Sequence, residues 1–141
     1  IHDLIPTDIV LLVSAFMKSN LIREVGFLSN EFFAGGEDVD YSMRVRRSGK
    51  QNFVVLSTYV LHKANRSIRK LGSRIARITL KAEILTNYYY NHMLGFLFST
   101  LLSISGYYIR YQLKIAPSIR TIYEYYKGIL DAIYHIASKV F

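Results

Sequence analysis

The sequence predicts a mixed α/β region up to residue 63, followed by an all-helical region from residue 64 to residue 141. Three short aliphatic or aromatic runs are typical of buried strands: residues 9–13, 53–56 and 59–62. Helix signals occupy residues 20–25 and 37–48, so we expect a sheet covered by helices. Beyond residue 64, apolar residues recur at the three- and four-residue spacing of amphipathic helices.

The helix expected from Glu37 to Ser48 has the clearest ends. Its first turn is acidic and its last turn is basic, so the charges at both ends complement the helix dipole. Gly49 follows as a stop signal. In the shorter helix before it, Asn20 is the expected N-cap and Gly26 the expected stop.

The charge of the chain is strongly basic and unevenly placed. The formal net charge is +8, and no Asp or Glu occurs between Tyr41 and Ala82. Eleven of the 18 Lys and Arg residues lie in that interval: Arg44, Arg46, Arg47, Lys50, Lys63, Arg66, Arg69, Lys70, Arg74, Arg77 and Lys81. Such a block favours an anionic partner such as phosphate, anionic lipid or nucleic acid; the alternative is a solvated basic face. Nucleic acid is the weakest of these choices, because the sequence has no zinc-finger spacing and the basic stripe shares its helix with an apolar face.

The helical region carries two apolar stripes and one long uncharged run. The first stripe comprises Ile68, Leu71, Ile75, Ile78, Ala82 and Leu85. The second follows the helix start signal Pro117-Ser118 and comprises Ile119, Ile122, Tyr126, Ile129, Ile133, Ile136 and Val140. No charged residue occurs from Ile84 to Ile109. The stripes predict amphipathic helices, and the second, at about three heptads, is too short to indicate a coiled coil by itself.

The uncharged run is a borderline candidate for crossing a membrane. The 17 residues from Met93 to Ile109 make about 26 Å of helix, against a hydrocarbon core of about 30 Å. Beside this run, the basic residues 66–82 are typical of a segment that lies on anionic lipid. We expect association with the cytoplasmic face of the cell membrane, either peripheral or anchored by residues 84–109. The alternative is a soluble helical bundle whose aromatic residues fill its own core.

Three carboxylates within four residues mark the start of the helix at Glu37, namely Glu37, Asp38 and Asp40. The free N–H groups and partial positive charge of a helix start keep such carboxylates ionised. An ionised carboxylate at a rigid position can accept a proton from a hydroxyl group. Gly35 and Gly36 precede the carboxylates and allow a substrate to approach closely.

A second interpretation of the same residues is structural. An ordinary helix start is often acidic, and Asp40 with Arg44 forms an i,i+4 surface pair worth a few tenths of a kcal/mol. His62, which follows the last expected strand, is likewise more often a structural histidine than a metal ligand.

The order of these parts resembles a known family. Residues 12–63 are similar to the second half of the catalytic domain of family 2 glycosyltransferases, which have the GT-A fold of nucleotide-diphospho-sugar transferases. The matching parts in order are Ser14-Ala15 in a hydrophobic run, Arg23-Glu24-Val25-Gly26-Phe27, Glu31-Phe32-Phe33, Glu37-Asp38-Val39-Asp40 with Arg44, Arg47-Ser48-Gly49, and His62-Lys63. The resemblance therefore makes residues 1–63 the acceptor-side half of such a domain, with residues 64–141 as a helical tail.

The resemblance implies an inverting transfer of a sugar from a nucleotide-diphosphate donor to a hydroxyl acceptor. It implies that Asp38 is the catalytic base and that Glu37 contacts the acceptor beside it. His62 falls where the family often has a ligand of a divalent metal, Mn²⁺ or Mg²⁺. Asp40 is expected to order the helix through Arg44 rather than to react.

The donor-binding half of the family pattern is missing from the sequence. No Asp-x-Asp pair, which holds metal and donor phosphate in the family, precedes residue 37. We therefore expect a fragment that is inactive alone and whose activity needs a longer parent or a partner chain. The alternative function is a non-catalytic basic helical module that binds a membrane surface or another anionic partner.

Overall fold

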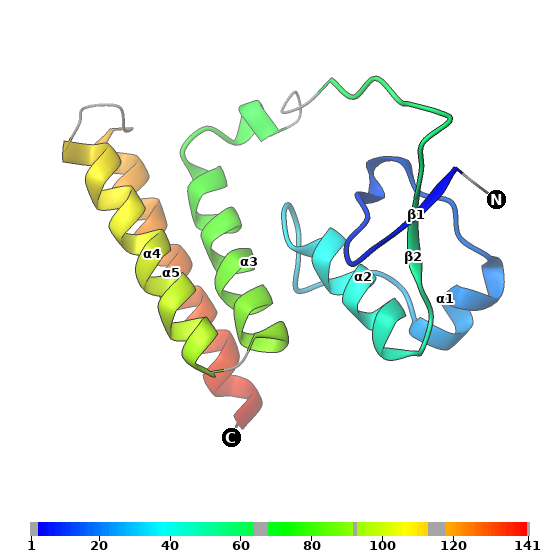
Figure 1. Ribbon diagram of the computed structural model, residues 1–141. Helices are drawn as coiled ribbons and strands as arrows, with labels where there is room; N and C mark the ends of the chain where they lie inside the picture. The colour runs from blue at the N-terminus through cyan, green and yellow to red at the C-terminus, as the bar shows by residue number, and fades with distance from the viewer. Residues whose placement is uncertain (1–2, 64–67, 92, 113–117, 141) are drawn as a thin grey trace.

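The computed structural model describes residues 3–63, 68–91, 93–112 and 118–140 (Figure 1). Its elements in chain order are β1 (Leu4–Thr7), a 3₁₀ turn (Leu12–Ser14), α1 (Ser19–Val25), α2 (Glu37–Arg47), β2 (Asn52–Val55), a second 3₁₀ turn (Ile68–Leu71), α3 (Arg74–Tyr90), α4 (Met93–Gln112) and α5 (Ile119–Val140). The fold is thus a mixture of helix and sheet in which helix predominates. The described residues form no sheet that is specific to the GT-A fold.

The sheet consists of two short antiparallel strands. Leu4 of β1 lies opposite Val55 of β2, and Thr7 lies opposite Asn52. The strand predicted at residues 53–56 is confirmed within one residue as β2. The two other predicted strands are wrong: residues 9–13 lead into a 3₁₀ turn, and residues 59–62 are irregular. Short aliphatic runs do not reveal whether a pairing partner exists, and in residues 59–62 the side chains are exposed.

The ends of α1 and α2 follow the glycine signals in the sequence. α2 begins at Glu37, directly after Gly36, whose φ of 89° is left-handed. α1 ends at Val25, and Gly26 follows with a φ of 88°. The predicted N-cap of α1, Asn20, is wrong, because the helix begins at Ser19 and the N-cap position is occupied by Lys18. The Lys18 side chain makes no capping hydrogen bond.

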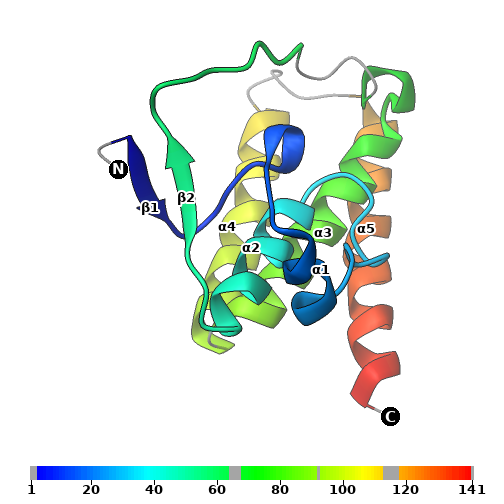
Figure 2. The ribbon, with the colours of Figure 1, turned by 90° about the vertical axis from the view of Figure 1, so that its right-hand side faces the viewer.

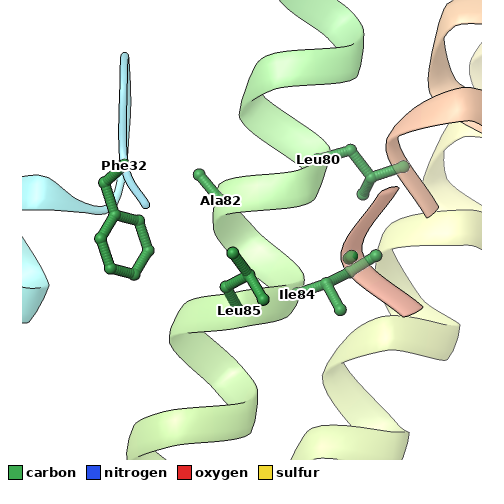
Figure 3. Packing of buried hydrophobic residues seen from close by; sticks show 6 residues of the cluster. Phe32, Leu80, Ala82, Ile84 and Leu85 are labelled. Atoms are coloured by element: carbon green, nitrogen blue, oxygen red, sulfur yellow. The ribbon is translucent and has the colours of Figure 1, made fainter. Parts of the chain in front are cut away.

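The buried core lies between α3 and its neighbours on two sides (Figure 3). Leu80, Ile84 and Leu85 of α3 form its centre, and Ala132 of α5 joins it. Phe32 comes from the loop before α2 and packs against α3 from the other side. A side chain at Gly36 would collide with the Phe32 ring at 2.6 Å, so the glycine lets this loop fold closely onto α3.

α5 lies closest to α3 at Gly128, and Ile129 and Ile136 of its apolar stripe pack against the core. The buried residues of α5 are Thr121, Glu124, Gly128 and Ala132. A Cβ atom at Gly128 would lie 2.6 Å from the backbone oxygen of Arg77, so the two helices touch at the backbone. Most members of the second stripe are nevertheless exposed, namely Ile119, Ile122, Tyr126, Ile133 and Val140. Hydrophobic spacing cannot identify a contact that depends on the absence of side chains.

The uncharged run forms parts of two helices. α3 ends at Tyr90, Asn91 adopts an extended conformation, and α4 begins at Met93. α3, α4 and α5 lie together, with the strands at the opposite side of the molecule (Figure 2). Within the described ranges, no helix is both long and apolar enough to cross a membrane. α4 nevertheless exposes a series of apolar side chains: Leu94, Leu97, Phe98, Leu101, Leu102, Ile104 and Ile109.

Candidate functional site

Asp38 lies in the first turn of α2 and is held by a distant part of the chain. Its Oδ1 accepts a hydrogen bond of 2.7 Å from the backbone N–H of Leu12, at the start of the first 3₁₀ turn. The side chain is half-buried, and in the described part of the chain no donor contacts its second oxygen. Asp38 is thus a fixed carboxylate with one oxygen left for another molecule.

Glu37 folds back onto its own loop. Its Oε2 accepts a hydrogen bond of 2.5 Å from the backbone N–H of Gly35. Gly35 has a φ of 108°, which few other residues adopt without strain, so this tight turn depends on glycine. The carboxylates of Glu37 and Asp38 therefore bond to different segments, and the predicted contact between Glu37 and an acceptor stays a prediction.

Asp40 is buried and fully engaged inside the protein. Arg44 donates to Asp40 Oδ2 from Nε at 3.0 Å and from a terminal nitrogen at 2.7 Å. Tyr90 of α3 donates to the other carboxylate oxygen at 2.5 Å. Arg44 also bonds the backbone oxygen of Val25 at 2.9 Å, which ties α2 to the end of α1. The pair expected from the sequence is thus present, but it is buried rather than on the surface, and it supports the helix that carries Asp38.

His62 lies on the exposed, irregular segment after β2. Among residues 3–63, 68–91, 93–112 and 118–140, no three His, Asp or Glu side chains come close enough to hold a metal ion. Asp40 offers no ligand either, because both of its oxygens are bonded to Arg44 and Tyr90. The described residues alone do not fit the expected metal site, and the role of His62 stays a prediction.

A second cluster of polar side chains joins the loop before α2 to the two long helices. Glu31 Oε2 accepts a hydrogen bond of 2.7 Å from Tyr89 and lies 3.2 Å from Nε2 of His135. Lys139 pairs with the other oxygen of Glu31. Burial raises the pKa of Glu31, but the hydrogen bonds from Lys139 and Tyr89 outweigh burial and hold that pKa below its usual value. No local sequence pattern predicts this cluster, because its members lie up to 108 residues apart and share no local spacing.

The chain matches no family model, no curated protein and no solved structure.

Proposed function

We propose that this chain contributes the acceptor side of an inverting glycosyltransferase, with Asp38 as the catalytic base. The observation that carries the proposal is the geometry of Asp38. One of its oxygens is fixed by Leu12, and no donor from the described residues contacts the other. The resemblance of residues 12–63 to family 2 glycosyltransferases supplies the reaction.

In the proposed step, one proton is transferred, one carbon–oxygen bond forms and another carbon–oxygen bond breaks. The acceptor hydroxyl gives its proton to the open oxygen of Asp38. The acceptor oxygen then bonds to the anomeric carbon of the donor sugar, on the face opposite the nucleoside diphosphate. The bond from that carbon to the diphosphate oxygen breaks, and the diphosphate leaves with the electron pair. The configuration at the anomeric carbon is therefore inverted.

A base of this kind has to keep its position while substrates exchange. The hydrogen bond from Leu12 restrains Asp38 itself. Below it in α2, Asp40 is bonded to Arg44 and to Tyr90, so the helix is tied to α1 and to α3. These contacts support a rigid base, because they tie three separate segments of the chain to α2 between Asp38 and Arg44.

The donor site and the metal come from the resemblance and not from the described residues. The family holds the donor through an Asp-x-Asp pair, which we expect in a longer parent or in a partner chain. The resemblance also implies Mn²⁺ or Mg²⁺ with His62 as a ligand. Such a metal would supply positive charge for the leaving diphosphate, but the proposal assigns no step to it.

The proposal is tested first by the complete reading frame and then by an assay. An upstream α/β region with an Asp-x-Asp pair is expected, whereas a start codon next to Ile1 would leave a partner chain as the source of the donor site. The purified complete protein should then release nucleoside diphosphate from a UDP-, GDP- or dTDP-linked sugar faster when a hydroxyl acceptor is added. Acceptor-independent hydrolysis alone would contradict a transferase.

The exposed apolar side chains of α4 favour a second function, which is compatible with the first. Phe98 and Leu101 are 66% and 65% exposed, and the basic residues of α3 lie on the neighbouring helix. We therefore also propose that residues 64–141 bind the cytoplasmic face of the cell membrane as a peripheral helical module. Without the transferase activity, this module would be the non-catalytic alternative.

A further inference from the structure

An open hollow lies between α3 and α5 and is lined mainly by cations. It encloses about 710 Å³, which is in the range of small-molecule sites. The cations that line it are Arg74 and Arg77 from α3, and Arg120 and Lys127 from α5. An adjoining hollow of about 300 Å³ is lined by Lys70 and Ser73, and it shares Arg74 and Arg120 with the first. We call the two hollows together the basic cavity.

The cations of the basic cavity lie where the backbone is already positive. α3 and α5 both begin at the same end of the bundle, so their N-termini lie together (Figures 1 and 2). Arg74 is the first residue of α3 and Arg120 is the second residue of α5. Neither helix has an acidic residue in its first turn, although acidic residues are the ones that stabilise this position. Two arginines beside two helix N-termini repel unless an anion lies between them.

The ion pairs of the structure leave these two arginines available. Arg77 donates to both oxygens of Asp131, at 2.5 and 3.0 Å, and Lys127 lies 4.3 Å from the centre of the Tyr123 ring. In contrast, no carboxylate of the described residues pairs with Arg74 or Arg120, whose side chains are exposed. The Ser73 hydroxyl does not cap α3. The unpaired donors therefore gather where the two hollows meet.

Glu124, a carboxylate on the wall of the cavity, limits where an anion can bind. Glu124 is 8% exposed and lines only the larger hollow, next to Arg77. It would repel an anion at that end, whereas among the described residues no acid lines the smaller hollow. An anion is thus most favourable between Arg74 and Arg120, at the edge of the smaller hollow that Ser73 also lines.

We propose that the basic cavity binds a phosphate or diphosphate group between Arg74 and Arg120. Guanidinium groups and helix N-termini together are the usual ligands of phosphate oxygens. The group belongs to a soluble phosphorylated ligand or to a lipid headgroup, since both present the same oxygens. This inference does not depend on the transferase proposal, because binding is measured without any donor sugar.

The first arm of the test uses inorganic pyrophosphate and isothermal titration at 150 mM NaCl. The wild-type chain should bind pyrophosphate saturably, and the double substitution Arg74→Gln with Arg120→Gln should weaken binding at least tenfold. The matched control is Lys18→Gln with Arg23→Gln, which removes the same charge from exposed side chains at α1. A cooperative thermal transition of the cavity variant shows that this variant is folded. Pyrophosphate should raise the Tm of wild type and control but leave the Tm of the cavity variant unchanged.

The second arm uses flotation with phosphatidylcholine vesicles that contain 10% phosphatidic acid. The bound phosphate group comes from a lipid headgroup if two results are found together. The vesicles must bind wild type and control better than the cavity variant, and pyrophosphate alone must not bind. A soluble ligand is the source when pyrophosphate binds and the vesicles do not distinguish the variants. The proposal is overturned when neither probe binds, or when the control loses as much binding as the cavity variant.

Discussion

The phenol of Tyr90 on α3 donates a hydrogen bond of 2.5 Å to the buried carboxylate of Asp40 on α2. Burial, together with this bond and the charge of Asp40, raises the pKa of Tyr90 well above its usual value. The phenol thus stays protonated at all ordinary pH values and donates permanently. The contact joins the region around Asp38 to the helical region.

Tyr90→Phe should destabilise the protein by about 1.5–3 kcal/mol, because Asp40 then lacks one donor to a buried charge. Equilibrium unfolding in urea measures this change. Tyr88→Phe removes a hydroxyl from the same helix and is the control, since no hydrogen bond from Tyr88 is present in the described residues. Equal effects of the two substitutions would mean that the bond to Asp40 adds no stability.

Glu31 should make the stability of the protein depend on acid pH. Its pKa is lower in the folded state than the usual 4.5, since the donors Lys139 and Tyr89 outweigh burial. A lowered folded-state pKa stabilises the protein above the unfolded-state pKa, and this contribution is lost as the pH falls through the folded-state value.

Glu31→Gln should therefore lower the free energy of unfolding by about 1 kcal/mol at pH 7. The effect is smaller than for a fully buried charge, because the Glu31 side chain is 25% exposed and solvent screens it. The difference from wild type should shrink below about pH 4 and vanish in stronger acid. Urea unfolding across this range measures it, with the surface residue change Glu24→Gln as control. A difference that stays constant with pH would exclude the charged form of Glu31 as the cause.

Gly128 should not tolerate even a methyl group. Its Cβ would lie 2.6 Å from the backbone oxygen of Arg77, and a backbone atom cannot move aside as a side chain can. Gly128→Ala should therefore destabilise by about 1–3 kcal/mol, despite the better helix propensity of Ala. At Gly106 in α4, no atom of the described part of the chain lies within 4 Å of the same position. Gly106→Ala should instead stabilise the protein by up to about 1 kcal/mol. Thermal unfolding measures both variants, and equal shifts in Tm would contradict the close packing of α3 on α5.

The exposed face of α4 should carry the salt-independent part of membrane binding. Phe98→Ser with Leu101→Ser should reduce flotation with vesicles of phosphatidylcholine and phosphatidylglycerol in 1 M NaCl by tenfold or more, because each side chain adds about 1.5–3 kcal/mol of burial. High salt screens the contribution of the basic residues. Leu11→Ser with Phe16→Ser changes similarly exposed side chains in the first region and is the control. Complete release of wild type by salt would show that α4 does not enter the lipid.

Local signals predicted some elements well and others not at all. The boundaries of α2 follow from its acidic start, its basic end and the glycine at 49, all of which act within a few residues. β1 escaped prediction because Pro6 lies inside it, and proline argues against a strand from sequence alone. The contact of α5 with α3 depends on Gly128 and Ala132, which carry almost no hydrophobic signal.

The site was predictable in its residues but not in its contacts. The carboxylates at the start of α2 stand out by type and spacing, and so does the pair of Asp40 with Arg44. Leu12 lies 26 residues from Asp38, and Tyr90 lies 50 residues from Asp40. No local pattern links such residues, since the fold of the whole chain brings them together. The metal role of His62 and the acceptor role of Glu37 still rest on the resemblance alone, and the catalytic role of Asp38 stays a proposal.

The turnover of Asp38→Asn in the complete protein tests the central proposal most directly. Asparagine keeps an oxygen that accepts the Leu12 N–H but cannot take a proton from the acceptor, so the fold should persist while the base is lost. Asp8→Asn removes a carboxylate that is 72% exposed and is the matched control. We expect nucleoside diphosphate release to fall at least a hundredfold in Asp38→Asn, with donor affinity and the control unchanged. Turnover within threefold of wild type would contradict the assignment of Asp38 as the base.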